Sequence, residues 1–213
     1  IVVVSMGPFP AEGMLRECLA RGCDEAVLIS GREFGGSDTF ATSQIIAAGL
    51  HRIGIDDGDI VMCGRQAIDG DTAQVGPQIA EKLGLPQITY AGDIELDPEK
   101  HEVTVKRMLE DGYMTVRTHT PCLITCIKEL NTPRYMSVPG IMESYSKPYT
   151  VLGYDDLKDE PLIEPDTIGL KGSPTNIAVS FTPPQKGVGV MLEGADSSTV
   201  SDLVGRLAEK HII

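Results

Sequence analysis

The chain has no tryptophan, and aromatic residues make up only 5% of its 213 positions. Basic residues are also scarce: 18 lysines and arginines stand against 31 aspartates and glutamates, so the formal net charge is −13. A negative surplus repels phosphate backbones and anionic lipid headgroups, and few aromatic rings leave little surface for base stacking. We therefore do not expect nucleic acids or membrane surfaces among the partners.

The sequence also lacks long apolar runs and closely spaced cysteine pairs. No run approaches the roughly 20 apolar residues of a membrane-spanning helix, and no signal peptide is visible. None of the five cysteines forms a Cys-x-x-Cys pair, so neither a disulfide framework nor a zinc ribbon is indicated. Cys122 and Cys126 stand in an apolar run, and we expect buried thiols there rather than metal ligands. This cysteine usage is typical of a reducing cytoplasm.

Apolar strands alternate with amphipathic helices over the first 91 residues. We predict strands at 1–5, 26–30, 59–63 and 87–91, and helices at 10–22, 37–51 and 72–83. Such alternation predicts an α/β fold, a Rossmann-like open and mainly parallel sheet with helices on both faces. The chain opens directly on a strand without an initiator methionine, so we expect that an N-terminal part of the domain is missing from this numbering.

The pattern changes after residue 91. Segments 93–96, 101–106 and 113–118 alternate apolar and polar residues around turn signals, which predicts an antiparallel hairpin added to the parallel core. A further buried strand is expected at 121–127, and short helix and loop from 133 to 145.

The C-terminal part reads as an extended arm that ends in a helix. Residues 147–185 hold six of the 14 prolines and show little periodicity. Residues 197–212 form an amphipathic helix with an apolar stripe of Val200, Leu203, Val204 and Leu207. We predict a nucleotide-binding domain over 1–146 and an arm over 147–213 that packs on a partner chain. The alternative is an arm that wraps around its own domain.

The strongest candidate site is the loop from Cys63 to Pro77, which leads from a strand end into a helix start. Gly70 removes side-chain bulk, and Asp71 or Thr72 is expected to cap the helix. The free N–H groups of residues 72–75 would then face a phosphate with the positive end of the helix dipole, next to the cation of Arg65. A well-capped surface helix with a glycine-rich entry is the alternative.

A second loop, Gly31–Phe40, holds Gly35-Gly36 before a Ser/Asp/Thr cap and another helix start. It could bind a second phosphate or a ring edge, or be a plain capped loop. The four histidines are scattered, and the carboxylates are spread over faces and turns, so no catalytic nucleophile set emerges. The chain therefore reads as a cofactor holder whose chemistry belongs to the cofactor.

Three stretches resemble the β subunit of electron transfer flavoproteins. They are Gly64–Gly76, similar to the family's adenine-nucleotide loop; Val105–Arg117 continuing to Pro121–Thr125, which matches the family signature; and Leu130–Met142, similar to the loop that docks dehydrogenases. The resemblance covers essentially the whole chain.

The resemblance implies a heterodimer with an α subunit that carries its own FAD. Asp69–Gly76 and Gly35–Thr39 resemble the electron-bifurcating members, in which the β subunit binds a second FAD. That FAD accepts hydride from NADH and passes one electron to ferredoxin or flavodoxin. The other electron goes through the α-subunit FAD to a flavoprotein dehydrogenase of acyl-CoA or hydroxy-acid type. The alternative is a non-bifurcating β subunit that binds structural AMP.

The expected cofactor-binding residues follow from these loops and from the end of the first strand. They are Met6, Gly7, Gly35, Gly36, Asp38, Thr39, Arg65, Gln66, Ala67, Ile68, Asp69, Gly70, Asp71, Thr72, Ala73, Gln74, Val75 and Gly76. No catalytic side chain and no metal ligand is expected. The dehydrogenase is expected to dock at Val138, Pro139, Ile141 and Met142, which are predicted to be exposed; the alternative is that they fold back onto the core.

Overall fold

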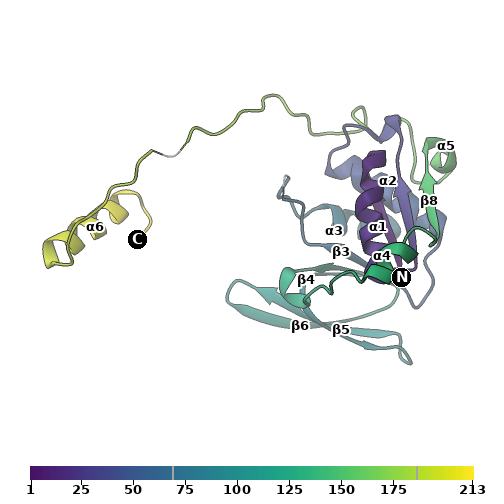
Figure 1. The fold of residues 1–213 in the computed structure, drawn as a ribbon, viewed down its shortest axis with the longest axis horizontal. Helices are drawn as coiled ribbons and strands as arrows, with labels where there is room; N and C mark the ends of the chain where they lie inside the picture. Colours follow the sequence, from purple (N-terminus) through teal and green to yellow (C-terminus); the bar gives the residue numbers. More distant parts are fainter. Residues whose placement is uncertain (69, 186) are drawn as a thin grey trace. The chain divides into compact units, whose positions relative to one another are not determined.

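The chain divides into two compact units in the computed structural model, which describes every residue except 69 and 186 (Figure 1). The first unit is Ile1–Asn176 and the second is Ile177–Ile213. The predicted fold class is confirmed, because parallel strands covered by helices, an antiparallel portion and a C-terminal helix are all present.

The strands of the first unit form two sheets rather than the single sheet expected from the alternation. The first sheet has the order β1-β2-β8 and is parallel throughout. Its strands are β1 (Val2–Met6), β2 (Glu25–Ile29) and β8 (Tyr149–Leu152). Helix α1 (Glu12–Ala20) packs on β2, and α2 (Thr39–Ile53) supplies Ile45 and Ala48 to the core around Ile29.

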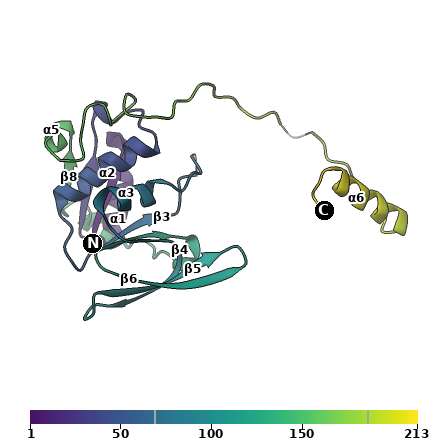
Figure 2. The same cartoon turned by 180° about the vertical axis from the view of Figure 1, so that it is seen from behind.

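The second sheet has the order β3-β7-β4-β5-β6. Strands β3 (Ile60–Gly64), β7 (Cys122–Cys126) and the start of β4 (Gln87–Asp97) are parallel, whereas β5 (Glu102–Leu109) and β6 (Gly112–His119) continue from β4 as an antiparallel meander. Helix α3 (Val75–Leu83) packs on β7 and on α2. The meander lies at the opposite end of the first unit from β8, as both views show (Figures 1 and 2).

The first unit extends beyond the boundary expected at residue 146. Strand β8 pairs with β2, and α5 (Tyr154–Leu157) follows it directly. Leu157, Ile163 and Ile168 are buried in the core cluster that contains Ile29. Prolines separate these apolar side chains without preventing their burial, so residues 147–176 belong to the α/β unit and the arm is shorter than expected.

The remaining elements of the first unit are short. Helix α4 (Val138–Glu143) packs on α1, and single 3₁₀ turns occur at Phe9–Ala11, Arg32–Phe34 and Lys128–Leu130.

The second unit contains helix α6 (Ser197–Glu209). Asp196 caps it by accepting backbone N–H bonds from Ser198 and Thr199 at 2.9 and 3.0 Å. Hydrogen bonds from Ser198 and Thr199 lower the pKa of Asp196 to about 2, so the cap stays ionised at neutral pH. Val200, Leu203 and Val204 are about half exposed along one face. Over the described parts of both units, no helix is long and apolar enough to cross a membrane.

Candidate nucleotide site

The carboxyl ends of β3, β7 and the parallel part of β4 meet at one edge of the second sheet. Arg65 follows β3 directly, and its backbone N–H donates to the carbonyl oxygen of Cys126 at 3.0 Å. Tyr90 lies at the same edge on β4, next to Ala91, which is paired with Cys126. Ligands of open α/β sheets bind at such an edge, and the loop that begins at Arg65 leaves the sheet there.

The loop between β3 and α3 is exposed over most of its length. Asp71 and Ala73 adopt left-handed backbone conformations, with φ of 51° and 53°. The side-chain amide of Gln66 donates to the carboxylate of Asp71, which closes the loop on itself. No heavy atom lies within 4 Å of the place where a Cβ of Gly70 would stand, so a ligand has room there. Asp69 lies outside the described residues.

The expected cap of α3 is wrong. The helix begins at Val75, and Gln74 is its N-cap residue without a side-chain capping bond. Asp71 and Thr72 therefore precede the helix. Because Pro77 has no N–H, the first helical turn offers only the N–H groups of Val75 and Gly76 rather than those of residues 72–75.

Gly76 also has a role in the packing of α3 against β7, which the sequence alone did not predict. It is buried, and a Cβ at this position would stand 2.7 Å from the Cγ2 methyl of Thr125 on β7. The absence of a side chain lets α3 approach β7 closely. This reason for a glycine is independent of any ligand.

The second predicted loop meets the first. The Thr39 hydroxyl donates to the side-chain oxygen of Gln74 at 3.0 Å, so the start of α2 is linked to the start of α3. Asp38 is the N-cap of α2: one carboxylate oxygen accepts from the Ala41 N–H at 3.0 Å and the other from the Thr175 N–H at 2.9 Å. With both oxygens engaged inside the protein, Asp38 supports the loop structurally.

The paired glycines of this loop are covered by the segment that follows α5. Gly36 has φ +74°, and a Cβ there would stand 3.1 Å from Cβ of Leu170. The carbonyl of Gly35 accepts the Leu170 N–H at 3.0 Å. At the end of β1, Met6 packs against the Ile29 cluster, and the Gly7 N–H donates to the Ile29 carbonyl at 3.0 Å.

Sequence reasoning missed a groove of about 680 Å³ beside Arg65. Its other lining residues are Gln66, Tyr90, Arg107, Met108, Leu109, Glu110, Ile127 and Glu129. Arg107 lies in the Val105–Arg117 stretch, which was expected to form part of an antiparallel hairpin. That expectation did not predict that Arg107 lies near the carboxyl ends of the parallel strands. The register provides the reason, because Arg107 pairs with Ala91 across β4 and β5.

Cys63, one residue before the end of β3, holds an unreactive thiol. Burial raises the pKa of Cys63 to about 11, so its sulfur is protonated at neutral pH. Burial also raises the pKa of Cys122 and Cys126. Within the described residues, no group of three or more histidine, cysteine or acidic side chains could hold a metal ion.

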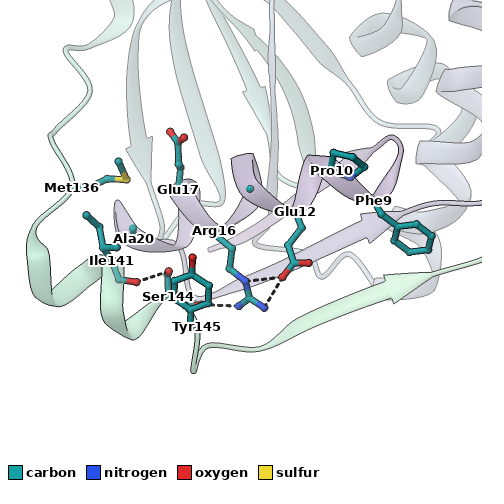
Figure 3. A pocket seen from close by; sticks show the side chains of 11 residues that line it. Phe9, Pro10, Glu12, Arg16, Glu17, Ala20, Met136, Ile141, Ser144 and Tyr145 are labelled. Carbon is teal, nitrogen blue, oxygen red and sulfur yellow. Dashed lines mark hydrogen bonds and ion pairs between the residues drawn. The ribbon is translucent and has the colours of Figure 1, made fainter.

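A second groove, of about 390 Å³, lies between α1 and α4 (Figure 3). The Arg16 guanidinium donates to the Ser144 carbonyl at 2.7 Å and pairs with Glu12 at 3.1 Å. The bond to Ser144 ties the end of α4 to α1, and the Arg16 guanidinium also stands 4.7 Å from the ring centre of Tyr149 on β8. Of the expected docking residues, Ile141 lines this groove, whereas Val138 and Met142 on the same helix are each 72% exposed outside it.

Comparison with known proteins shows similarity over the whole of this chain. Residues 1–157 match the family model described as the electron transfer flavoprotein domain. The chain is 65% identical to the acryloyl-CoA reductase electron transfer subunit gamma of Anaerotignum propionicum, over 100% of this chain and 79% of the relative. It is 50% identical, with the same shares covered, to a subunit of the caffeyl-CoA reductase–Etf complex of Acetobacterium woodii.

Proteins named for the family itself are also similar. The electron transfer flavoprotein subunit beta of Thermoanaerobacterium thermosaccharolyticum is 46% identical over 100% of this chain and 79% of its own length. The family model covers well over half of the chain, and these relatives match it from end to end. The chain therefore belongs to the electron transfer flavoprotein family, among its β subunits.

Proposed function

We propose that this β subunit forms a heterodimer with an FAD-carrying α subunit and that its own loop, residues 65–76, binds a second FAD. When bound, this flavin would accept hydride from NADH and serve two one-electron acceptors, ferredoxin or flavodoxin and the α-subunit FAD. Two relatives are named as subunits of acyl-CoA-type reductase systems, which favours this version over a simple carrier. The cysteine usage favours a cytoplasmic location.

The observation that carries the proposal is the backbone conformation of the β3–α3 loop. Left-handed residues that alternate with right-handed ones turn successive backbone N–H groups inward, and such concavities bind anions. Asp71 and Ala73 provide the left-handed positions, and Gly70 leaves the approach open. Arg65 at the start of the loop adds a positive charge that would favour an anionic ligand there. The chain's part is to bind, orient and electrostatically tune the cofactor.

The alternative is that the same loop binds AMP, which has one phosphate and no redox chemistry. Relatives named only as subunit beta, such as that of Clostridium acetobutylicum at 46% identity, do not decide between the two nucleotides. Both candidates use the loop, and they differ in what the protein releases when it unfolds.

Acid extraction of the purified heterodimer separates the alternatives. We expect two FAD molecules per heterodimer, whereas one FAD with one AMP would establish the non-bifurcating version. Gly70→Val should expel the β-subunit nucleotide, because a Cβ at position 70 has open space around it and a branched side chain would fill that approach. Gly58→Val is the matched control, since Gly58 is also free of neighbours within 4 Å but lies on a different loop. Unchanged nucleotide content in Gly70→Val would refute the loop assignment.

The dehydrogenase partner is proposed to dock at the exposed face of α4. Val138, Pro139, Ile141 and Met142 present apolar surface there, and the Ser137 hydroxyl accepts the Gly140 N–H at 3.1 Å, which fixes the helix start. A small, rigid apolar cluster of this kind suits insertion into a pocket on a partner.

A further inference from the structure

Tyr90 stands next to two arginines in the 680 Å³ groove at the carboxyl edge of the second sheet. The guanidinium carbons of Arg65 and Arg107 lie 5.8 and 6.0 Å from the centre of the Tyr90 ring. The arginines come from different elements, the loop after β3 and the middle of the meander. Their convergence on one ring is therefore a product of the fold and not of sequence proximity.

The backbone at Tyr90 is held in an unusual conformation. Its φ is +59°, in the left-handed region that bulky residues rarely adopt. The Tyr90 N–H donates to the Thr125 hydroxyl at 3.2 Å, and the register of β4 against β7 shifts between Ile88 and Ala91, the stretch that contains Tyr90. Such strain persists only where the surroundings fix it, and it concentrates at binding sites. β-Bulges next to binding sites likewise change the direction of side chains, and here the side chain concerned is that of Tyr90.

The two guanidiniums retain unused donors. Arg107 donates through Nε to the Thr89 hydroxyl at 3.2 Å, which orients the fork and leaves its terminal amino groups for another partner. Neither arginine forms an ion pair with a carboxylate within the described residues, although Glu110 and Glu129 also line the groove. In a chain of net charge −13, two arginines beside one ring make this groove a place where an anion can bind.

We propose that this groove binds a phosphate group of a dinucleotide, with Arg107 and Arg65 as its ligands. Planar guanidinium forks match phosphate oxygens in a bidentate manner, and the phenol of Tyr90 adds a further donor. The apolar side chains of Met108, Leu109 and Ile127 line the same groove and suit a ribose or a ring. The inference rests on the proposed function, which requires FAD and NADH near this edge, and either dinucleotide could supply the phosphate.

The test compares Arg107→Ala and Arg107→Lys with Arg117→Ala in the assembled heterodimer. Arg117 lies on β6 of the same meander and pairs with Glu102 at 3.7 Å, outside the groove, so it controls for loss of positive charge. The FAD dissociation constant is measured by flavin fluorescence, and NAD⁺ binding to the FAD-loaded heterodimer by calorimetry. Urea unfolding midpoints confirm that each variant is folded, and Arg65→Ala provides a second, independent variant.

We expect Arg107→Ala to weaken one dinucleotide by about tenfold or more, as loss of a charge-assisted hydrogen bond does. Arg107→Lys should recover only part of this, because an ammonium lacks the fork. Weaker FAD binding would identify the resident cofactor as the source of the phosphate, and weaker NAD⁺ binding with unchanged FAD would identify the electron donor. Parental affinities for both in Arg107→Ala and Arg65→Ala would overturn the inference. A parent heterodimer without FAD in the β subunit would instead refute the proposed function.

Discussion

Gly70 in the β3–α3 loop and Gly76 in the first turn of α3 are required for different physical reasons. Gly70 has open space where a side chain would lie, whereas a Cβ on Gly76 would stand 2.7 Å from the Thr125 methyl. We expect Gly76→Ala to lower the free energy of unfolding by about 1–3 kcal/mol, the usual cost of overpacking a core contact. Gly70→Ala should change it by no more than about 0.5 kcal/mol.

Urea unfolding of the nucleotide-free subunit measures both values. The nucleotide-free state is needed because a ligand that binds only the folded state would add its own stabilisation. Equal unfolding free energies for Gly76→Ala and the parent would mean that α3 and β7 are packed less closely than described.

Asp38 and Tyr90 differ in how far their roles could be predicted from the sequence. Asp38 was expected to bind a cofactor, and its position before α2 correctly indicated a cap. Its second oxygen is used by Thr175, a contact across 137 positions that no local pattern encodes. The place of Tyr90 in the groove could not be predicted for a related reason. Its left-handed backbone at an irregularity of β4 depends on how β4 pairs with β5 and β7, which only the fold determines.

Elements with strong periodicity or alternation were predictable from the sequence. Helix α2, with its Asp38 cap, and the β4–β6 meander lie close to where the pattern placed them. Strand β8 was missed because Tyr149–Leu152 is short and follows a proline in a stretch without periodicity. Its pairing with β2 is a long-range parallel contact, and local propensity carries no signal for such a partner.

The burial of residues after β8 predicts how truncation of the chain affects folding. A chain that stops after Asn176 keeps β8 and the buried side chains of Leu157, Ile163 and Ile168, and should unfold cooperatively. A chain that stops after Ser146 loses them all. Burial of each such side chain contributes about 1.5–3 kcal/mol, and domains have only about 5–15 kcal/mol in total, so the shorter chain should not fold.

Circular dichroism during thermal unfolding distinguishes the two truncated chains. The longer one should show a sigmoidal transition, and the shorter one a shallow, non-cooperative slope. A cooperative transition at the same midpoint in both would show that residues 147–176 contribute nothing to the first unit.

At the scale of the whole molecule, the second unit carries apolar surface, and none of its described residues is buried. Helix α6 has a half-exposed stripe of Val200, Leu203 and Val204. We propose that this stripe packs on the α subunit, and we expect Leu203→Asp to weaken the heterodimer by about tenfold or more, as charge in a buried contact does. Ser201→Asp adds the same charge beside the stripe and should leave assembly unchanged.

Native mass spectrometry across a dilution series measures the dissociation constant of each heterodimer. Circular dichroism of the isolated variants checks that the first unit is intact, so that weak assembly is not confused with misfolding. Parental affinity in Leu203→Asp, or an equal loss in both variants, would contradict the assignment of the stripe to the interface.

The contacts of residues 149–176 also impose an order on biosynthesis. Strand β8 pairs with β2, and the Thr175 N–H donates to Asp38, so both contacts need residues near the end of the first unit. A nascent chain therefore cannot complete that unit until residue 176 has been translated. Contacts between residues so far apart form slowly. At about 5–20 residues per second, translation of residues 177–213 provides seconds for this closure. Helix α6 is translated after the first unit, so the β3–α3 loop can gain its full support before the proposed contact of α6 with the α subunit can form.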